Sequence, residues 1–301
     1  MRFSKWHGLG NDYIIVEKTD LPGIPTSDQC ALLCDRHFGV GGDGILVHCP
    51  PTGAVPGAVA RMRIFNPDGS EPEMCGNGIR MFALYLQRRD LIGDGEAIIE
   101  TLAGPIRSTV LDDGRVRVHM GTARFNSPSI DSVPWGPDAE IVERELEADG
   151  VAYNFTFVDV GNPHCIIVCD SLEAVDLERV GPSIENHPLF PHRTNVEFIQ
   201  WRRDDSVSMR VWERGVGETQ ACGTGATAVG AAAVRLGLAG SPVTVHLLGG
   251  DLEIEAADDG QVVMIGTADE VFTGRLSRDL LTRLDWAGDD SSRPPTTTRS
   301  K

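Results

Sequence analysis

Lysine is nearly absent from this chain of 301 residues, which has it only at Lys5, Lys18 and Lys301. Enzymes that use pyridoxal phosphate hold the cofactor as a Schiff base on a lysine side chain. None of the three lysines lies in a glycine-rich phosphate-binding context. The sequence therefore gives no evidence for a pyridoxal site.

Positive charge is also scarce. The chain has 27 lysine and arginine residues against 44 aspartate and glutamate residues, which gives a formal net charge of -17. Nucleic acids bind basic patches through the release of counterions, and no run rich in lysine or arginine appears in the sequence. We therefore expect no nucleic-acid partner.

Long hydrophobic runs are missing as well. The first thirty residues contain one apolar run, 13–16, which is far too short for the core of a signal peptide. No stretch approaches the ~18 apolar residues of a membrane span. The sequence thus predicts a protein without a secretory signal and without a membrane partner.

Cysteine is present, but not in the patterns of a disulfide framework or a zinc site. The chain has an odd number of cysteines and no CxxC motif, which argues against a secreted disulfide scaffold and favours a reducing cytoplasm. Two pairs are four residues apart without a nearby histidine cluster, so we expect no structural metal. The seven cysteines are Cys30, Cys34, Cys49, Cys75, Cys165, Cys169 and Cys222.

The remaining composition is that of a globular protein, with 41% hydrophobic and 24% charged residues. The length favours two domains. We expect an N-terminal domain over 1–121, joined by a returning segment 268–286, and a C-terminal domain over 122–267. Residues 287–301 contain no large apolar side chain, and we expect them to form a disordered tail.

Short glycine-rich clusters separate the apolar runs, a pattern typical of many short strands joined by tight turns. Two segments, 79–89 and 226–236, predict helices instead. The second is almost entirely small and apolar, so we expect it to be buried on every side. The runs that predict strands are 13–16, 115–120, 165–168, 206–212 and 243–248.

The chain contains an internal repeat. A shift of 147 positions (222 minus 75) aligns 63–78 with 210–225 without a gap, and 10–16 resembles 161–168 at an offset of 151. The repeat predicts two halves with one topology, each a sheet with one buried helix. Matching pairs are Arg63/Arg210, Phe65/Trp212, Glu71/Glu218, Cys75/Cys222, Gly76/Gly223, Gly78/Gly225 and Gly93/Gly240.

Each half places the motif Cys-Gly-x-Gly where a helix is expected to begin. The first N–H groups of a helix lack intrahelical partners and carry the positive end of the dipole, so they bind anions. The glycines leave these amides accessible to a ligand. A thiol at a helix N-terminus also favours its thiolate form, so we expect lowered pKa values for Cys75 and Cys222.

If the two halves close on each other, the two thiols approach one bound molecule from opposite sides. This geometry suits inversion at a carbon that carries an acidic proton, because a thiolate removes the proton from one face while a thiol donates one to the other. No cofactor is then needed as an electron sink, provided that the two helix N-termini stabilise the developing negative charge.

Six segments carry a resemblance to a known family. They are HGLGNDY (7–13), RHFGVGGDG (36–44), IFNPDGSEPEMCGNGIR (64–80), GNPH (161–164), TNVEF (194–198) and ERGVGETQACGTGA (213–226). In this order they resemble diaminopimelate epimerase, from Met1 to about Gly274. The resemblance implies a cofactor-independent enzyme that interconverts LL- and meso-diaminopimelate on the bacterial route to lysine and peptidoglycan. It also implies an α+β fold of two pseudo-symmetric domains, each a curved, mostly antiparallel sheet wrapped around a central helix, with the active site in the cleft between them.

The resemblance also implies roles for individual residues. Cys75 and Cys222 would be the acid and base, and His164 and Glu213 would tune their pKa values. The substrate ligands would be Asn11, Asn66, Gly76, Asn77, Asn162, Asn195, Glu213, Arg214, Gly223 and Thr224. A cation such as Arg214 suits a substrate with two carboxylates, because a guanidinium grips a carboxylate with two hydrogen bonds.

The chain departs from the family pattern at Gly44, where some members have a glutamine. That contact cannot be transferred, and Asp43 or a backbone group would replace it. GVGGDG is not a nucleotide loop, since it lacks GK[ST] and a βαβ context.

Other interpretations remain open. A related two-cysteine racemase for another amino acid, or a non-catalytic module that captures an amino acid at the helix termini, would fit the repeat. A thiol oxidoreductase is disfavoured by the missing CxxC motif. The facing thiols could oxidise to a Cys75–Cys222 disulfide in the empty enzyme, and the family resemblance implies a homodimer.

Overall fold

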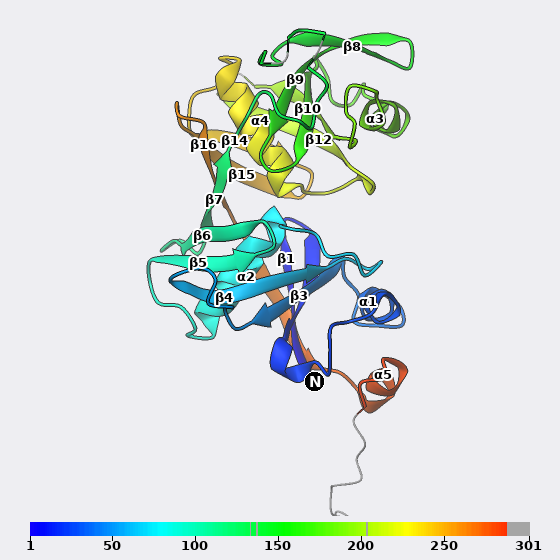
Figure 1. Ribbon diagram of the computed structural model, residues 1–301, viewed down its shortest axis with the longest axis vertical. Helices are drawn as coiled ribbons and strands as arrows, with labels where there is room; N and C mark the ends of the chain where they lie inside the picture. The colour runs from blue at the N-terminus through cyan, green and yellow to red at the C-terminus, as the bar shows by residue number, and fades with distance from the viewer. Residues whose placement is uncertain (133, 137, 203, 288–301) are drawn as a thin grey trace, which may run out of the picture.

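A computed structural model of the chain describes residues 1–132, 134–136, 138–202 and 204–287. It is an α+β protein with mostly antiparallel strands and few helices, which confirms the predicted class. Two lobes are stacked along the longest axis (Figure 1) and the chain ends of the described part lie in the lower one. Most of the expected disordered tail, 288–301, lies outside the described residues.

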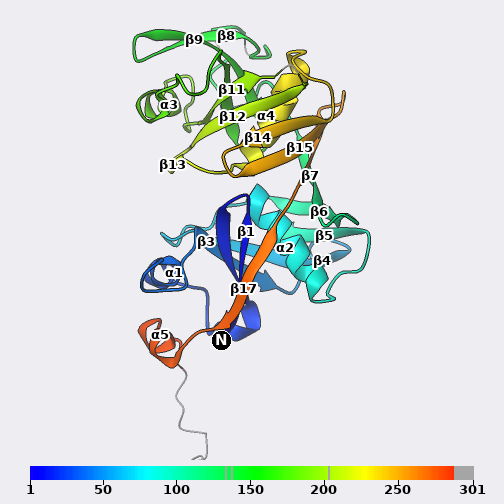
Figure 2. The same cartoon turned by 180° about the vertical axis from the view of Figure 1, so that it is seen from behind.

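The lower lobe, drawn from blue to green in Figure 1 with β17 in orange, contains eight strands that pair in the order β17, β1, β2, β3, β4, β5, β6, β7. The strand that comes last in the sequence therefore returns to the first (Figure 2). The strands are β1 (Arg2–Gly8), β2 (Asn11–Glu17), β3 (Gly44–Cys49), β4 (Ala58–Phe65), β5 (Glu96–Thr101), β6 (Gly104–Val110), β7 (Val116–Thr122) and β17 (Asp269–Arg275).

The upper lobe pairs its strands in the order β8, β9, β10, β11, β12, β14, β15, β16, and the short β13 adds to the end of β12. The strands are β8 (Arg144–Ala148), β9 (Val151–Asp159), β10 (Pro163–Val168), β11 (Asn195–Trp201), β12 (Ser206–Glu213), β13 (Gly217–Glu218), β14 (Val243–Leu247), β15 (Gly250–Ala256) and β16 (Gln261–Gly266). All five strand segments expected from the sequence lie in or overlap strands.

The strand directions follow the same pattern in both lobes. The parallel pairs are β2·β3 and β4·β5 in the lower lobe, and β10·β11 and β12·β14 in the upper lobe. The antiparallel pair β7·β16 joins the two lobes, so one sheet runs through the molecule. The succession of parallel and antiparallel pairs along this sheet is the same whether it is followed from β17 or from β8. The topology therefore corresponds to the sequence repeat.

Side-chain contacts repeat as well. Arg63 forms an ion pair with Glu71, with 2.7 Å between Nε and Oε1. Arg210 forms the corresponding pair with Glu218, also at 2.7 Å. Each pair ties a strand to the loop that leads into a cysteine motif, so the two loops are braced in the same way.

Each parallel strand pair is connected through a helix, as parallel neighbours require a crossover. Helices α2 (Gly76–Arg88) and α4 (Gly223–Arg235) are the two that the sequence predicts, and both begin three residues earlier than expected. The helices begin earlier because Cys75 and Cys222 act as their N-cap residues. Each cysteine has an extended backbone, and its sulfur accepts a hydrogen bond from the N–H group three residues later.

Helix α4 is buried almost throughout, as its composition predicts. Small side chains allow the sheet to approach closely, since a Cβ at Gly230 would lie 2.4 Å from Cγ2 of Ile254. Helix α2 is buried from Gly76 to Leu86 with larger side chains, including Phe82 and Tyr85. Both helices therefore form the centre of one hydrophobic core that spans the lobes.

The sequence did not reveal the other helical segments. Helix α1 begins with a capping box of Thr26 and Gln29, and α3 contains Gly181 and Pro182, which oppose helix prediction. Gly181 is required there because Trp212 packs against it, 2.6 Å from the place of a Cβ. These segments are α1 (Ser27–Cys34), α3 (Leu177–Glu185), α5 (Arg278–Arg283) and the 3-10 turn Lys18–Asp20.

No helix in the described part of the chain is long and apolar enough to cross a membrane. All seven cysteines lie within the described residues, and each carries a free thiol.

Candidate active site

The starts of helices α2 and α4 meet between the lobes. A Cβ placed on Gly76 would lie 3.0 Å from the Cα atom of Gly223, and a Cβ on Gly223 would lie 3.0 Å from the Cα atom of Gly76. Backbone therefore packs against backbone at this point. The two helix N-termini, with their unpaired N–H groups, are brought together at one place.

Cys75 caps helix α2. Its Sγ accepts a hydrogen bond from the Gly78 N–H at 3.3 Å, and its thiol donates to the Tyr13 hydroxyl at 3.7 Å. The residue as a whole is half-buried. Burial raises its pKa above the usual range, the cap and Tyr13 act in the opposite direction, and the charge of Glu213 raises it further.

Cys222 caps helix α4 in the same way, with 3.4 Å between Sγ and the Gly225 nitrogen. It also lies 3.5 Å from the Thr224 hydroxyl and is only 5% exposed. Burial raises its pKa well above the usual range, and the carboxylates of Glu213 and Glu197 raise it further.

The expectation of lowered thiol pKa values is therefore wrong for the unliganded protein. The helix caps favour each thiolate, as expected, but the removal of the two sulfur atoms from water is the larger effect. Both sites therefore favour the neutral thiol over the thiolate.

An amide network crosses the lobe boundary below Cys75. The Asn77 amide donates to Asn11 Oδ1 at 3.1 Å and to the Ala221 carbonyl at 3.0 Å. The Asn11 amide in turn donates to Asp43 Oδ2 at 2.9 Å. Asn11 and Asn77 are thus held together, and Asp43 fixes which face of the Asn11 amide is available to a ligand.

A second network lies beside Cys222. His164 is fully buried, with Nδ1 2.6 Å from Glu197 Oε1 and Nε2 3.1 Å from Asn162 Oδ1. The Asn162 amide donates to the Thr224 hydroxyl at 3.3 Å. This chain of contacts runs from the buried Glu197 carboxyl to Thr224, which touches Cys222, so His164 is connected to the thiol through Asn162 and Thr224.

Glu213 lies near both thiols. Burial raises the pKa of its carboxyl, although hydrogen bonds from the Thr219 hydroxyl and the Cys222 thiol oppose that effect. Thr219 Oγ1 lies 2.5 Å from Glu213 Oε1. A carboxyl held in this way can accept a hydrogen bond from an ammonium group, and it already accepts one from the Cys222 thiol.

Arg214 and Asn195 form the other end of the site. Asn195 is buried, and its Oδ1 accepts the Arg214 backbone N–H at 2.9 Å. The Arg214 guanidinium donates to the His192 carbonyl at 3.2 Å and has no acidic partner in the described part of the chain. Its remaining N–H groups are therefore available to a carboxylate.

Asn66 is the predicted ligand that the structure does not join to the others. Its amide donates to Ser70 Oγ at 3.0 Å, and its backbone N–H donates to the Ser70 carbonyl within the same turn. Within the described residues no hydrogen bond links Asn66 to either cysteine network, so its role as a ligand stays a prediction from the family resemblance.

The space of the absent glutamine at Gly44 is filled by Tyr13. A Cβ on Gly44 would lie 2.5 Å from Tyr13 Cε1 and 2.8 Å from the Phe65 carbonyl oxygen. The ring of Tyr13 therefore crosses this position and brings its hydroxyl to Cys75. We expected Asp43 or a backbone group to replace the glutamine contact. Asp43 accepts a hydrogen bond from the Asn11 amide, and its contact with a ligand stays a prediction.

Three residues of the site were not singled out from the sequence. Tyr13 belongs to an apolar run that predicts a strand and nothing more. Glu197 lies in a buried strand, and Arg80 lies in a helix. In each case the signal was a polar group at a position where the pattern requires an apolar one. Such a residue is rarely buried without a partner.

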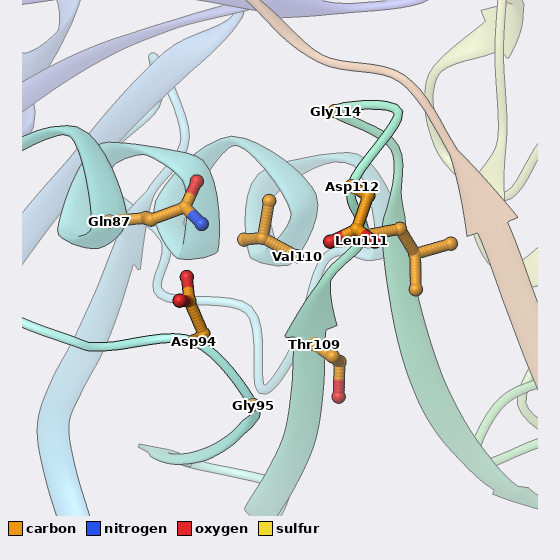
Figure 3. A pocket seen from close by; sticks show the side chains of 8 residues that line it. All are labelled: Gln87, Asp94, Gly95, Thr109, Val110, Leu111, Asp112 and Gly114. Atoms are coloured by element: carbon orange, nitrogen blue, oxygen red, sulfur yellow. The ribbon is translucent and has the colours of Figure 1, made fainter.

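No group of three or more histidine, cysteine, aspartate or glutamate side chains within the described residues is arranged to hold a metal ion. A surface cavity of about 500 Å3 opens in the lower lobe, away from both cysteines (Figure 3). Its lining contains none of the candidate site residues: it consists of Gln87, Asp94, Gly95, Thr109, Val110, Leu111, Asp112 and Gly114.

Comparison with known sequences gives one consistent result. The sequence model of a family described as diaminopimelate epimerase matches residues 3–126 and 156–271. A protein named diaminopimelate epimerase from Pelotomaculum thermopropionicum is 47% identical over 285 residues, which cover 91% of this chain and 98% of that protein. Diaminopimelate epimerase 1 from a Nostoc species is 44% identical over 281 residues, which cover 92% and 99%.

Solved structures resemble the fold at lower sequence identity. A phenazine biosynthesis protein of the PhzF family from Bacillus anthracis superimposes with a TM-score of 0.66 at 18% identity and covers 92% of this chain and 99% of its own. A probable proline racemase from Agrobacterium radiobacter K84 gives a TM-score of 0.65 at 16% identity, with 92% and 93% covered. These likenesses concern the fold alone.

Proposed function

Because this chain belongs to the diaminopimelate epimerase family, we propose that it interconverts LL- and meso-diaminopimelate by proton transfer between two cysteines. One observation carries the mechanism: Cys75 and Cys222 cap two helices whose first residues are in contact. This contact supports a single site to which both sulfur atoms contribute, although 147 residues separate them in the chain (222 minus 75).

The reaction requires one thiolate and one thiol. The thiolate removes the α-proton and becomes a thiol, and the resulting carbanion takes a proton from the other thiol, which becomes a thiolate. The two cysteines have then exchanged states and the carbon is inverted. Free N–H groups at the starts of α2 and α4, from Gly76, Asn77, Gly223 and Thr224, would hold the carboxylate as charge builds on it, and each well-placed donor contributes about 3 to 4 kcal/mol.

The two ends of the substrate would be held differently. Glu213 lies beside Cys222 and suits the ammonium group at the reacting carbon. Arg214 suits the carboxylate at the distant end, because its guanidinium has no acidic partner among the described residues. Asn11, Asn66, Asn162 and Asn195 would complete the contacts. This arrangement favours a substrate with two carboxylates.

The test is proton NMR of LL-diaminopimelate with reduced enzyme in D2O, free of metal and pyridoxal. We expect the α-proton signal at one centre to disappear while the meso isomer accumulates. The Cys75→Ala and Cys222→Ala variants should lose both effects. The Cys75→Ser and Cys222→Ser variants keep a helix-capping oxygen, so they separate loss of the thiol from loss of the cap.

Two outcomes would contradict the proposal. Faster racemisation of a monocarboxylic amino acid than of diaminopimelate would identify a racemase of another substrate. If both alanine variants behaved like the wild type in this assay, the protein would instead be a non-catalytic module that binds an amino acid.

We also propose that the protein works as a homodimer in the cytoplasm and that its domains are 1–121 with 268–286, and 122–267. The free thiols support a reducing compartment. Strand β17 pairs with β1 on one edge and exposes Val271 and Phe272, which supports contact with a second copy. Sedimentation of the enzyme only as a monomer would refute the dimer.

A further inference from the structure

Arg80 is a buried charge without an acidic partner. It lies in the second turn of helix α2 and is 0% exposed. Its guanidinium donates to the Gly76 carbonyl at 3.0 Å, to Asn77 Oδ1 at 2.9 Å and to the Thr267 carbonyl at 3.2 Å. No acidic side chain within the described residues pairs with it, so its positive charge is not neutralised locally. A buried arginine of this kind is rare and costly.

The repeat supplies a direct comparison. The position that corresponds to Arg80 in helix α4 is Thr227 (80 plus 147), whose hydroxyl donates to the Gly223 carbonyl at 2.8 Å. Both side chains therefore satisfy the first carbonyl of their helix. A neutral hydroxyl is sufficient for that bond, so the charge on Arg80 serves something else.

The guanidinium is bonded to the two residues that directly follow Cys75, through the Gly76 carbonyl and Asn77 Oδ1. Burial lowers the pKa of Arg80 to about 10, which still leaves it charged at neutral pH, and the interaction that opposes this lowering is with Cys75. Such an interaction acts on both partners, so Arg80 favours the Cys75 thiolate. The other groups that face Cys75 are Tyr13 from β2, Glu213 from β12 and the Gly78 and Asn77 amides from α2.

Arg80 also fixes a contact between the lobes. It holds Asn77 Oδ1, which leaves the amide nitrogen of Asn77 pointing at Asn11 and at the Ala221 carbonyl. Ala221 directly precedes Cys222. The side chain therefore links the helix of one cysteine to the loop of the other.

We propose that Arg80 is a positioning residue of the reaction: it orients the Asn77 amide that joins the two helix starts, and it supplies the positive charge that lets Cys75 act as a thiolate. The inference rests on the proposed function for its catalytic meaning, but the ionisation of Cys75 is measured without substrate. The two can therefore fail separately.

The experiment follows the rate of Cys75 alkylation by iodoacetamide from about pH 6 up to the highest pH at which the protein stays folded, with the modified peptide identified by mass spectrometry. Where a midpoint lies above that range, the pH displacement of the rising rates measures the same shift. Replacing Arg80 with methionine removes the charge and keeps the length. We expect the pH midpoint of Cys75 alkylation to rise by about one unit, which is about tenfold less thiolate at neutral pH. The kcat of epimerisation should fall at least as far.

Two variants act as matched controls. Thr227→Val removes the corresponding bond in α4 without a charge, and it should leave the Cys75 midpoint in place. Arg80→Lys keeps the charge but loses the planar guanidinium with its several N–H donors. The alkylation midpoint should therefore stay near that of the wild type, while kcat falls because the Asn77 amide is no longer oriented. If Arg80→Met does not fold, Arg80→Gln supplies the neutral variant, with the same expected rise.

A folded neutral variant with the wild-type midpoint would overturn the inference. So would an Arg80→Lys variant whose midpoint rises as far as that of the neutral variant, because loss of packing would then explain both. Absence of epimerase activity in the wild-type enzyme would refute the proposed function and leave the alkylation result standing.

Discussion

Two opposing effects act on each active-site thiol at the scale of the single residue. The helix cap favours the thiolate, and burial favours the thiol. Cys222 is buried and has two carboxyl groups nearby, whereas Cys75 is partly exposed and contacts Tyr13. The two cysteines are therefore not equivalent, although the repeat places them at equivalent positions.

This difference predicts the order in which the thiols react in the free enzyme. Because both pKa values are raised, alkylation should be slow at pH 7 and should accelerate through pH 9 and above, where the thiolates form. Cys75 should react before Cys222 at every pH. Peptide mapping after iodoacetamide treatment measures both rates, and preferential labelling of Cys222 would contradict the assignment of environments.

Tyr13 gives a second prediction for a single residue. When Cys75 is a thiolate, the Tyr13 hydroxyl donates the hydrogen bond to it, which lowers the pKa of Cys75, so Tyr13→Phe should raise that pKa. One hydrogen bond is worth about 0.5–1.5 kcal/mol, and we expect kcat/KM near neutral pH to fall about 3- to 10-fold. The pH–rate profile measures the rise in pKa as a shift of its low-pH side to higher pH. Tyr153→Phe, a change on β9 of the upper lobe, is the control and should leave the profile unchanged.

At the scale of the element, the contact between the two helix starts depends on glycine. A Cβ at position 223 would meet the Gly76 backbone, which cannot move without shifting helix α2. Gly223→Ala should therefore push the two helices apart, lower the free energy of unfolding by about 1–3 kcal/mol and abolish most of the activity. Urea unfolding and the exchange assay measure the two effects.

The repeat again offers a matched control. Gly240 has open space at the place of its Cβ, and its repeat partner Gly93 does as well. Gly240→Ala should change stability by no more than about 0.5 kcal/mol and leave turnover intact. Equal losses in the two variants would show that the helix contact has no special importance.

At the scale of the whole molecule, the lobes are joined by the β7·β16 strand pair and by the packing of α2 against α4. The two thiols lie on opposite sides of that boundary. We predict that mild oxidation links Cys75 to Cys222 in the substrate-free enzyme and abolishes activity, and that dithiothreitol restores it. Bound substrate should protect, since it occupies the space between the thiols.

Mass spectrometry of the non-reduced digest identifies the linked peptides. Cys169→Ser is a useful control, because it removes another partly exposed thiol, which directly follows the end of β10 and belongs to neither cysteine motif. Full activity after oxidation, with no difference between reduced and oxidised samples, would contradict the prediction.

The sequence by itself determined the class of the fold, the repeat, the two central helices and the two cysteines. These features were readable because they are local or repeated: glycines mark turns, small residues mark a buried helix, and a gap-free alignment of the halves needs no knowledge of contacts. The family resemblance added the asparagines and Arg214, which would otherwise read as turn and surface residues.

Only the tertiary structure decided the state of the thiols and what surrounds them. The pKa of a cysteine depends on how much water is removed from it, and that removal comes from elements far apart in the chain. The same holds for Tyr13 in the space beside Gly44, for Arg80 beneath the helix start and for Glu197 behind His164. Each is a polar group in an apolar pattern, and its role follows from neighbours that the order of residues does not contain.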